Sequence, residues 1–312
     1  MIKILSSAIS FGLAMTFTQL AHAQLPTDIA VQLQKMGRVV NPPATAAIYA
    51  PRALDKEPYQ GVSVQRDIAY GADPRNLLDV FVPTAAAATP RKVFIFVHGG
   101  GFTRGDRRAA GSPFYDNVMM WAAKNNMIGV NMTYRLAHKD VWPAAQQDIG
   151  QAVGWVLKNI AARGGDPKQV FLMGHSAGAA HVASYIAYEP VHAAPGSGIA
   201  GALMLSGIFK LAPGLEDAAA MSYFESDPAV YPARLAQEGL LKSRVPLWIA
   251  YSELNPLSFE LQFNNIKGEL CKAGRCPATN IFAGHSHMSE IYSINSDDPT
   301  IGNAMLAFVK NR

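Results

Sequence analysis

The sequence predicts an α/β protein with a mostly parallel, eight-stranded sheet, helices on both faces and a small cap. Segments with strand and helix character alternate along most of the 312 residues, and this alternation is typical of a parallel sheet covered on both sides. Several expected strands are short, continuous apolar runs, as strands buried on both faces require. Glycine and proline clusters separate these segments and indicate turns.

The expected elements follow the chain in a simple order. Two strands at 62–70 and 77–82 form an antiparallel hairpin around Gly71-Ala72-Asp73-Pro74. Six further strands are expected at 92–97, 127–134, 170–173, 201–205, 246–251 and 279–283. Helices are expected at 28–36, 114–124, 143–162, 177–188, 259–270 and 300–309.

The predicted domain organisation has three parts. Residues 1–23 form an export signal, 24–60 an N-terminal arm, and 61–312 the main domain. In the arm, Asn41-Pro42-Pro43 is expected to break the helical stretch. The segment 208–241 interrupts the alternation with proline, glycine and acidic residues, so we expect it to form the small cap together with the arm.

Composition narrows the functional classes. Hydrophobic residues make up 49% and charged residues 16% of the chain, which is sufficient for a large core. The formal charge is +4, without a basic run interleaved with aromatic residues, so we expect no nucleic-acid partner. The last expected helix, 300–309, suggests pairing with a second copy, and a homodimer is therefore a prediction.

The first residues predict export. Lys3 precedes an apolar run at 4–20, and Ala21-His22-Ala23 provides a small-x-small cleavage pattern. The run is shorter than the ~20 residues that a membrane span requires. We expect cleavage after Ala23, no stable membrane insertion, and a mature protein that is periplasmic or secreted.

The two cysteines, Cys271 and Cys276, lie in Cys-Lys-Ala-Gly-Arg-Cys. Because an exported protein meets an oxidising compartment, the first interpretation is a disulfide that closes this short loop. Two free thiols are the alternative. A zinc site is not expected, because a second ligand pair at the usual spacing is missing.

Gly174-His175-Ser176-Ala177-Gly178 follows an expected strand and opens an expected helix. This is the G-x-S-x-G pattern in the strand–turn–helix context in which it presents a nucleophile. The glycines leave room for a tight turn, and the helix N-terminus favours a developing negative charge. Ser176 is therefore the predicted nucleophile.

His98-Gly99-Gly100-Gly101-Phe102 comes directly after the strand at 92–97. Glycines at this place let backbone amides point into a site, where they stabilise the oxyanion of an acyl-transfer transition state. We assign these donors to Gly100, Gly101 and Ala177. His98 is expected to hold the loop. The segment lacks the Gly-Lys-Ser/Thr ending of a nucleotide loop.

Together the two motifs resemble the hormone-sensitive-lipase-like branch of the α/β hydrolases, from about Asn76 onward. Further matches to that branch occur in order along the chain: Tyr134-Arg135-Leu136-Ala137, Pro143-Ala144-Ala145, Asp148, Trp155 and Gly165-Asp166-Pro167. The resemblance implies an α/β-hydrolase fold, a small cap from the N-terminal arm, ester hydrolysis, and neither a metal nor another cofactor.

The general base is expected after the last strand, in Gly284-His285-Ser286-His287-Met288. The family pattern Gly-x-x-His selects His287. His285 is then interpreted as a loop or substrate-facing residue.

The third residue expected in the site, the acid that holds the catalytic histidine, departs from the family pattern. Relatives carry Glu-x-Asp-Pro after the seventh strand, whereas this chain has Glu253-Leu254-Asn255-Pro256. An amide holds an imidazole by hydrogen bonding but supplies no charge, and Asp-to-Asn exchange in a chymotrypsin-type triad lowers kcat ~10⁴-fold. Three interpretations stay open: Glu253 replaces the acid, Glu260 does so, or a slow enzyme uses Asn255, the position expected to touch His287.

The leading functional hypothesis is an exported esterase that cleaves short-chain or aryl carboxylic esters, small-molecule substrates, through an acyl-enzyme on Ser176. An amidase of the arylformamidase kind would use the same groups, because both reactions pass through the same tetrahedral state. The alternative from another class is a catalytically impaired binding protein that retains the fold.

Overall fold

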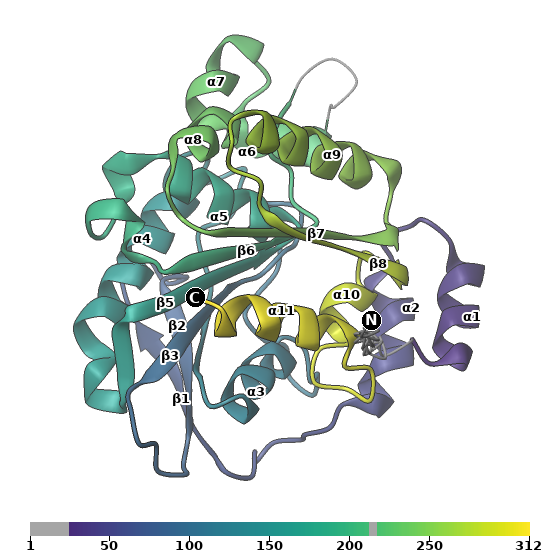
Figure 1. The fold of residues 1–312 in the computed structure, drawn as a ribbon, viewed down its shortest axis with the longest axis vertical. Coiled ribbons are helices and arrows are strands. Elements are labelled where there is room, and N and C mark those ends of the chain that lie inside the picture. The colour runs from purple at the N-terminus through teal and green to yellow at the C-terminus, as the bar shows by residue number, and fades with distance from the viewer. Residues whose placement is uncertain (1–24, 212–216) are drawn as a thin grey trace, which may run out of the picture.

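A computed structural model describes residues 25–211 and 217–312, so the export signal expected at 1–23 lies outside the described residues. One eight-stranded sheet runs through the molecule in the order β1-β2-β4-β3-β5-β6-β7-β8 (Figure 1). β2 is antiparallel to both of its neighbours, and the pairings from β4 to β8 are parallel. The predicted mostly parallel sheet is therefore confirmed. The strands are β1 (Val62–Ala69), β2 (Leu77–Pro83), β3 (Arg91–Val97), β4 (Ile128–Met132), β5 (Gly165–His175), β6 (Gly201–Leu205), β7 (Leu247–Leu254) and β8 (Ala278–Ser286).

Helices cover both faces of the sheet, as Figure 1 shows for α8 and α9 on one side and α3 and α11 on the other. The side chains of β3 explain why both faces need cover: Ile95 and Phe96 are both fully buried but belong to two different apolar clusters. One face packs against α4 (Ala144–Asn159), α5 (Ala177–Ala187), α8 (Gln237–Lys242) and α9 (Leu257–Lys272). The other packs against α3 (Asp116–Lys124), α10 (Ser289–Tyr292) and α11 (Thr300–Lys310).

The N-terminal arm contains α1 (Thr27–Met36), α2 (Pro42–Tyr49) and the short η1 (Ala50–Arg52). The predicted break of the helical stretch is confirmed, because α1 ends at Met36, and a second helix, which was not predicted, begins at Pro42. Asn41 caps it by accepting a hydrogen bond from the amide of Ala44 at 3.1 Å. Proline fits the first helical turn, where its missing N–H is not needed.

The segment that interrupts the alternation forms α6 (Ala218–Phe224), η5 (Pro228–Val230), α7 (Tyr231–Arg234) and α8. It is anchored through α6, where the Tyr223 ring stacks on Phe102 with centroids 5.7 Å apart. Phe102 belongs to the glycine-rich loop after β3, so this segment packs directly against that loop. The remaining short helices are η2 (Ala161–Arg163), η3 (Glu189–Val191) and η4 (Pro195–Gly198).

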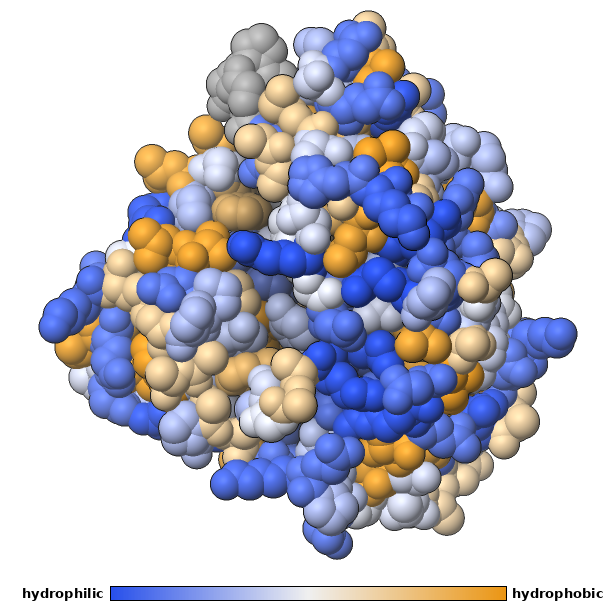
Figure 2. All heavy atoms as spheres, turned by 180° about the vertical axis from the view of Figure 1, so that it is seen from behind, coloured by the Kyte–Doolittle hydropathy of each residue, from blue (hydrophilic) through white to orange (hydrophobic). Residues whose placement is uncertain are grey.

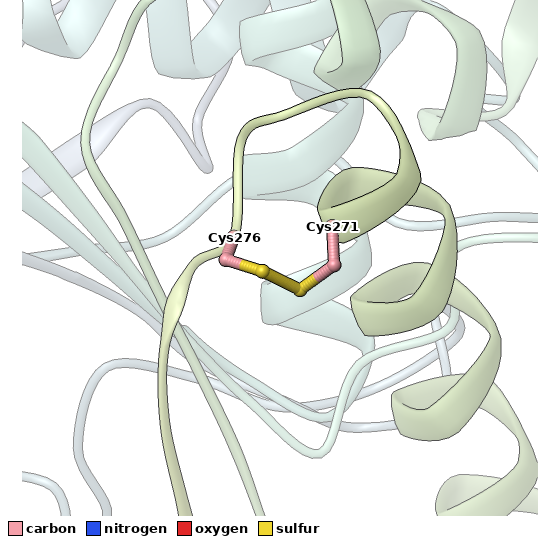
Figure 3. Close-up of a disulfide and its surroundings, with 2 residues drawn as sticks. All are labelled: Cys271 and Cys276. Carbon is pink, nitrogen blue, oxygen red and sulfur yellow. A yellow bond between two sulfur atoms is a disulfide. The ribbon is translucent and has the colours of Figure 1, made fainter.

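A disulfide joins Cys271, in the last turn of α9, to Cys276, just before β8 (Figure 3). The chain reverses between them at Gly274, whose φ of 72° lies in the left-handed region that favours glycine. The predicted pairing is thus confirmed. The bridge ties the end of a helix to the strand that leads toward His287.

None of the described helices is long and apolar enough to cross a membrane. On the face drawn in Figure 2, hydrophobic residues form small patches separated by hydrophilic ones. α11 buries Ile301, Met305 and Phe308 within the chain's own core. Its apolar face is therefore covered without a second copy, and the homodimer stays a prediction.

Candidate active site

Ser176 lies on a sharp turn between β5 and α5. Its φ and ψ of 57° and −125° are unusual for a residue with a side chain. The flanking glycines are sterically required: a Cβ on Gly174 would lie 2.3 Å from the Gly178 oxygen, and one on Gly178 would lie 2.2 Å from the Val97 oxygen. The turn therefore packs backbone against backbone and leaves the Ser176 side chain in the pocket above the sheet.

His287 directly follows β8, and its ring lies beside the Ser176 side chain. Its Nε2 lies 2.9 Å from the Ser176 Oγ, and its Nδ1 lies 2.7 Å from the Asn255 Oδ1. With Nδ1–H donating to the amide oxygen, Nε2 carries the lone pair that accepts the hydroxyl proton. Burial, together with the neighbouring His175, lowers the pKa of His287 well below its usual 6.5. The imidazole is therefore neutral and ready to act as a base at neutral pH.

The glycine-rich loop lines the same pocket as Ser176 and His287. Gly100 and Gly101 have φ angles of 131° and 59°, both in the region that favours glycine. Their carbonyls accept from Arg104 and Thr103 within the turn, and no hydrogen bond within 25–211 and 217–312 uses their amides. Ala177 is the first residue of α5, so its amide is one of the unpaired donors of a helix N-terminus.

His98 supports this loop, in the role expected of it. Its Nδ1–H donates to the Gly99 carbonyl at 2.7 Å, and its ring stacks on Tyr134. Tyr134 in turn donates its hydroxyl to the His98 carbonyl at 2.8 Å. Full burial lowers the pKa of His98 to about 4, so the ring stays neutral. The next residue, Arg135, pairs with buried Asp148 at 2.8 Å.

The segment after β7 places the three candidate acids differently. Asn255 is fully buried and contacts His287, as expected. Glu253 is exposed, and its carboxylate accepts from the Gly284 amide at 2.8 Å, so the structure does not bring it to His287. Glu260 pairs with Arg38 of the arm at 3.2 Å. Within the described ranges, neither glutamate forms a hydrogen bond or ion pair with the imidazole, because each is held by another partner.

A buried carboxylate beside His287 comes from a residue that sequence reasoning missed. Glu290, on α10, is fully buried, and its Oε1 lies 3.9 Å from the His287 Nδ1. Its Oε2 accepts from the Asn255 amide group at 3.4 Å, and its Oε1 lies 3.1 Å from the His175 Nε2. Asn255 also donates to Ser206 Oγ at 2.9 Å. The available signal was the position of Glu290 three residues after the base, where a helical turn returns a side chain.

His285 does not face the substrate pocket, contrary to its interpretation as a loop or substrate-facing residue. It is fully buried, with Nδ1 3.2 Å from the Ser289 Oγ and Nε2 3.4 Å from the Asp298 Oδ2. β8 ends at Ser286 and the chain turns at His287, so His285 and His287 enter different environments although only one residue separates them.

The pocket above Ser176 has a volume of about 500 Å³, within the usual range for small-molecule sites. Its walls combine the glycine loop with residues of distant segments. The arm contributes Val40 and Pro42, and the segment before α6 contributes Asp217. Aromatic and apolar side chains provide most of the remaining lining: Tyr115, Ile208, Phe259, Met288 and Tyr292.

His175, His287 and Glu290 also satisfy the distances of a metal site, with one ligand atom each within 4.8 Å of one another. Every one of these residues takes part in a hydrogen bond inside the site. A metal ion would have to compete with these hydrogen bonds. We therefore interpret the cluster as a hydrogen-bonded network, and the absence of a cofactor stays a prediction.

The sheet order, the antiparallel β2, the turn after β5 and the histidine after β8 define the α/β-hydrolase fold. Solved esterase structures share it. Esterase B from Lactobacillus rhamnosis superposes with a TM-score of 0.70 at 18% identity, over 91% of this chain and 96% of that one. A truncated carbohydrate esterase from gut microbiota has a TM-score of 0.63 at 16% identity, over 80% of this chain and 95% of that one. At these identities the likeness establishes the fold.

Sequence comparisons are more specific for the central region. Residues 78–194 match the family model named BD-FAE. Esterase B1 of Culex pipiens is 36% identical over 123 residues, which are 36% of this chain and 22% of that protein. Esterase LipQ of Mycobacterium tuberculosis is 27% identical over 227 residues, or 67% of this chain and 53% of that protein. The chain thus spans between about a fifth and a half of the length of these two relatives, both of which are named as esterases.

Proposed function

We propose that the protein is an exported serine esterase that hydrolyses short-chain or aryl carboxylic esters through an acyl-enzyme on Ser176. The observation that carries the proposal is the 2.9 Å contact between Ser176 Oγ and His287 Nε2, in a pocket that the glycine-rich loop also lines. A nucleophile, a base and unpaired amide donors are the three parts that acyl transfer requires. The esterases among the relatives support the same reaction class.

In the proposed mechanism, the Ser176 Oγ attacks the ester carbonyl carbon while His287 Nε2 takes the hydroxyl proton. The carbonyl oxygen becomes an oxyanion, which the amides of Gly100, Gly101 and Ala177 stabilise. The tetrahedral intermediate expels the alcohol, which leaves with the proton from His287. Water then attacks the acyl-enzyme with His287 again as base, and the carboxylic acid is released with Ser176 restored.

The substrate class follows from the size and lining of the pocket. A volume of about 500 Å³ suits a small acyl group and a small or aromatic alcohol. Tyr115, Phe259 and Tyr292 present aromatic faces along its walls, and such rings pack well against an aryl ester. Val40 and Pro42 of the arm and Asp217 before α6 all line the pocket, which supports the predicted role of these segments as a cap.

Export is part of the proposal. The disulfide between Cys271 and Cys276 supports a working compartment that is oxidising. The same inference follows from the signal pattern at 1–23, with cleavage after Ala23. The mature protein is then periplasmic or secreted.

The test compares the mature protein with Ser176→Ala on p-nitrophenyl acetate. We expect a loss of at least about 10³-fold in kcat for the variant, because removing the nucleophile leaves only binding and oxyanion stabilisation. A fluorophosphonate probe followed by peptide mapping should label Ser176 in the folded protein. Equal hydrolysis by the two proteins, or no labelling of Ser176, would refute the proposal.

Two other functions would give different results in assays of this kind. Faster turnover of N-formylaniline than of phenyl formate would favour an arylformamidase-like amidase, which needs the same tetrahedral intermediate. A protein that neither hydrolyses these substrates nor reacts with the probe would favour a binding protein, the interpretation that Asn255 suggested.

A further inference from the structure

Resting on the proposed function, we infer that Glu290 is a positioning residue that orients Asn255 and supplies the negative charge that an aspartate at position 255 would otherwise provide. The proposal concerns an anion that reaches the imidazole from α10, whereas the acid was expected on the segment after β7. It explains how a site with an amide in the acid position retains an activated base.

The environment of Glu290 is unusual for a carboxylate. The side chain is fully buried, and in the described part of the chain its ion-pair contacts are with His175 and His287, not with a lysine or arginine. Burying an ionised carboxylate without such a cation is costly. The cost is offset only if the groups around it need a negative charge, and the group beside it that becomes positive during the proposed reaction is His287.

Glu290 also determines which end of the Asn255 amide faces the imidazole. An ionised carboxylate only accepts hydrogen bonds, so the amide group that approaches Oε2 at 3.4 Å must be the NH₂. Ser206 Oγ, at 2.9 Å, accepts the other hydrogen. The Asn255 oxygen is thereby directed to the His287 Nδ1, at 2.7 Å. This orientation selects the tautomer with the proton on Nδ1 and the lone pair facing Ser176.

His175 holds the Glu290 carboxylate in place. Its Nε2 lies within hydrogen-bonding distance of both the His287 carbonyl at 2.9 Å and the Glu290 Oε1 at 3.1 Å. Among the described residues its buried Nδ1 has no hydrogen-bond partner. An N–H on Nε2 can donate to the carboxylate, so His175 orients Glu290.

Other charged or titratable groups lie around this network and must be held constant in a test. His285 and Asp298 form a buried pair behind Glu290. Tyr49 of α2 contacts Asp298. Arg38 of the arm donates to the Asn255 carbonyl at 3.3 Å. None of them is altered in the variants below.

The first experiment compares Glu290→Gln with Glu269→Gln, which neutralises an exposed glutamate of α9 paired with Lys272. An opposite charge within about 4–6 Å raises the pKa of a base by one unit or more. Glu290→Gln should therefore move the acid limb of kcat/KM about one pH unit lower and reduce kcat about 100-fold. Glu269→Gln should leave both unchanged. A purely structural role for Glu290 would lower yield or stability without moving the limb.

Two further variants test the exchange of charge between the two positions. The double variant Asn255→Asp with Glu290→Gln returns a carboxylate to the imidazole, and we expect at least a tenfold recovery of kcat over Glu290→Gln. Asn255→Asp alone should change kcat less than tenfold, since Glu290 already supplies an anion. A gain of about 100-fold or more in that single variant would overturn the inference, and this result does not depend on whether Glu290→Gln folds.

A titration separates this inference from the proposed function. In the Ser176→Ala background, the His287 ring protons are followed by NMR across pH with and without Glu290→Gln. A lower midpoint in the Glu290→Gln protein supports the inference even if the wild-type protein hydrolyses no ester, a result that would remove only the proposed function. Equal midpoints overturn the inference even if the wild-type protein is an active esterase.

Discussion

Substituting Gly100 by alanine should separate the oxyanion amides from the rest of the site. A Cβ at this position would lie 2.0 Å from the Arg104 carbonyl oxygen and 3.2 Å from the Gly105 Cα. The φ of 131° is also unfavourable for alanine. Because Arg104 donates to the Gly100 carbonyl at 3.2 Å, relief of the clash must open the turn and displace the Gly100 amide.

The expected effect follows from the loss of one donor. Removing an oxyanion-hole hydrogen bond costs about 3 kcal/mol, and each 1.36 kcal/mol corresponds to about a factor of ten in rate. We therefore expect kcat to fall about 100-fold in Gly100→Ala. The assay is hydrolysis of p-nitrophenyl acetate, with the concentration of competent enzyme taken from fluorophosphonate titration.

Gly101→Ala is the matched control. Its φ of 59° costs a non-glycine residue about 1–2 kcal/mol of folding stability. The added Cβ meets no clash, because the nearest atom is the Ala219 Cβ at 3.8 Å. The turn stays intact, so kcat should fall less than tenfold while urea unfolding detects the strain. If Gly100→Ala kept a kcat within threefold of the wild type, or Gly101→Ala were the slower variant, the argument from turn geometry would fail.

Two other predictions concern the base and the disulfide. Because burial and His175 lower the pKa of His287 well below 6.5, the neutral base persists as the pH falls, and the acid limb of kcat/KM should have its midpoint below pH 6.5; a midpoint above 7 in a profile from pH 4 to 9 would contradict this. The double substitution of Cys271 and Cys276 by serine opens a loop with a sequence separation of 5 and should lower the free energy of unfolding by about 2 kcal/mol. Its kcat should match the wild type, because the bridge joins the ends of α9 and β8 that are far from Ser176 along the chain. Urea unfolding identical to that of the wild type would contradict the prediction, since the loop would then be held without the bridge.

The sheet and the nucleophile were predictable because their signals are local. Continuous apolar runs mark strands buried on both faces, such as β3 and β6. The turn at Ser176 needs glycine at two fixed positions, and this requirement is visible in the sequence as Gly174 and Gly178. The position after the last strand left His285 and His287 as candidates for the base, and the family resemblance selected His287 and placed Asn255 at the acid position.

The remaining parts of the site depend on contacts between distant segments. Glu290 lies on a four-residue helix without a periodic apolar pattern, so only the packed structure reveals that it meets Asn255. The second helix of the arm begins at two prolines, and helix formation there depends on the Asn41 cap. Glu253 and Glu260 were plausible acids because they lie close to position 255 in the sequence. In the structure Glu253 accepts from the Gly284 amide and Glu260 pairs with Arg38.

The arm links the recognition of substrate to the support of the base. Val40 and Pro42 form part of the pocket wall, while Arg38, two residues before Val40, holds the Asn255 carbonyl. A change in this short stretch therefore alters selectivity and turnover at once. Directed evolution for a bulkier alcohol would meet a trade-off at these positions, whereas the wall formed by Tyr115 belongs to a different element and offers an independent route to the same change.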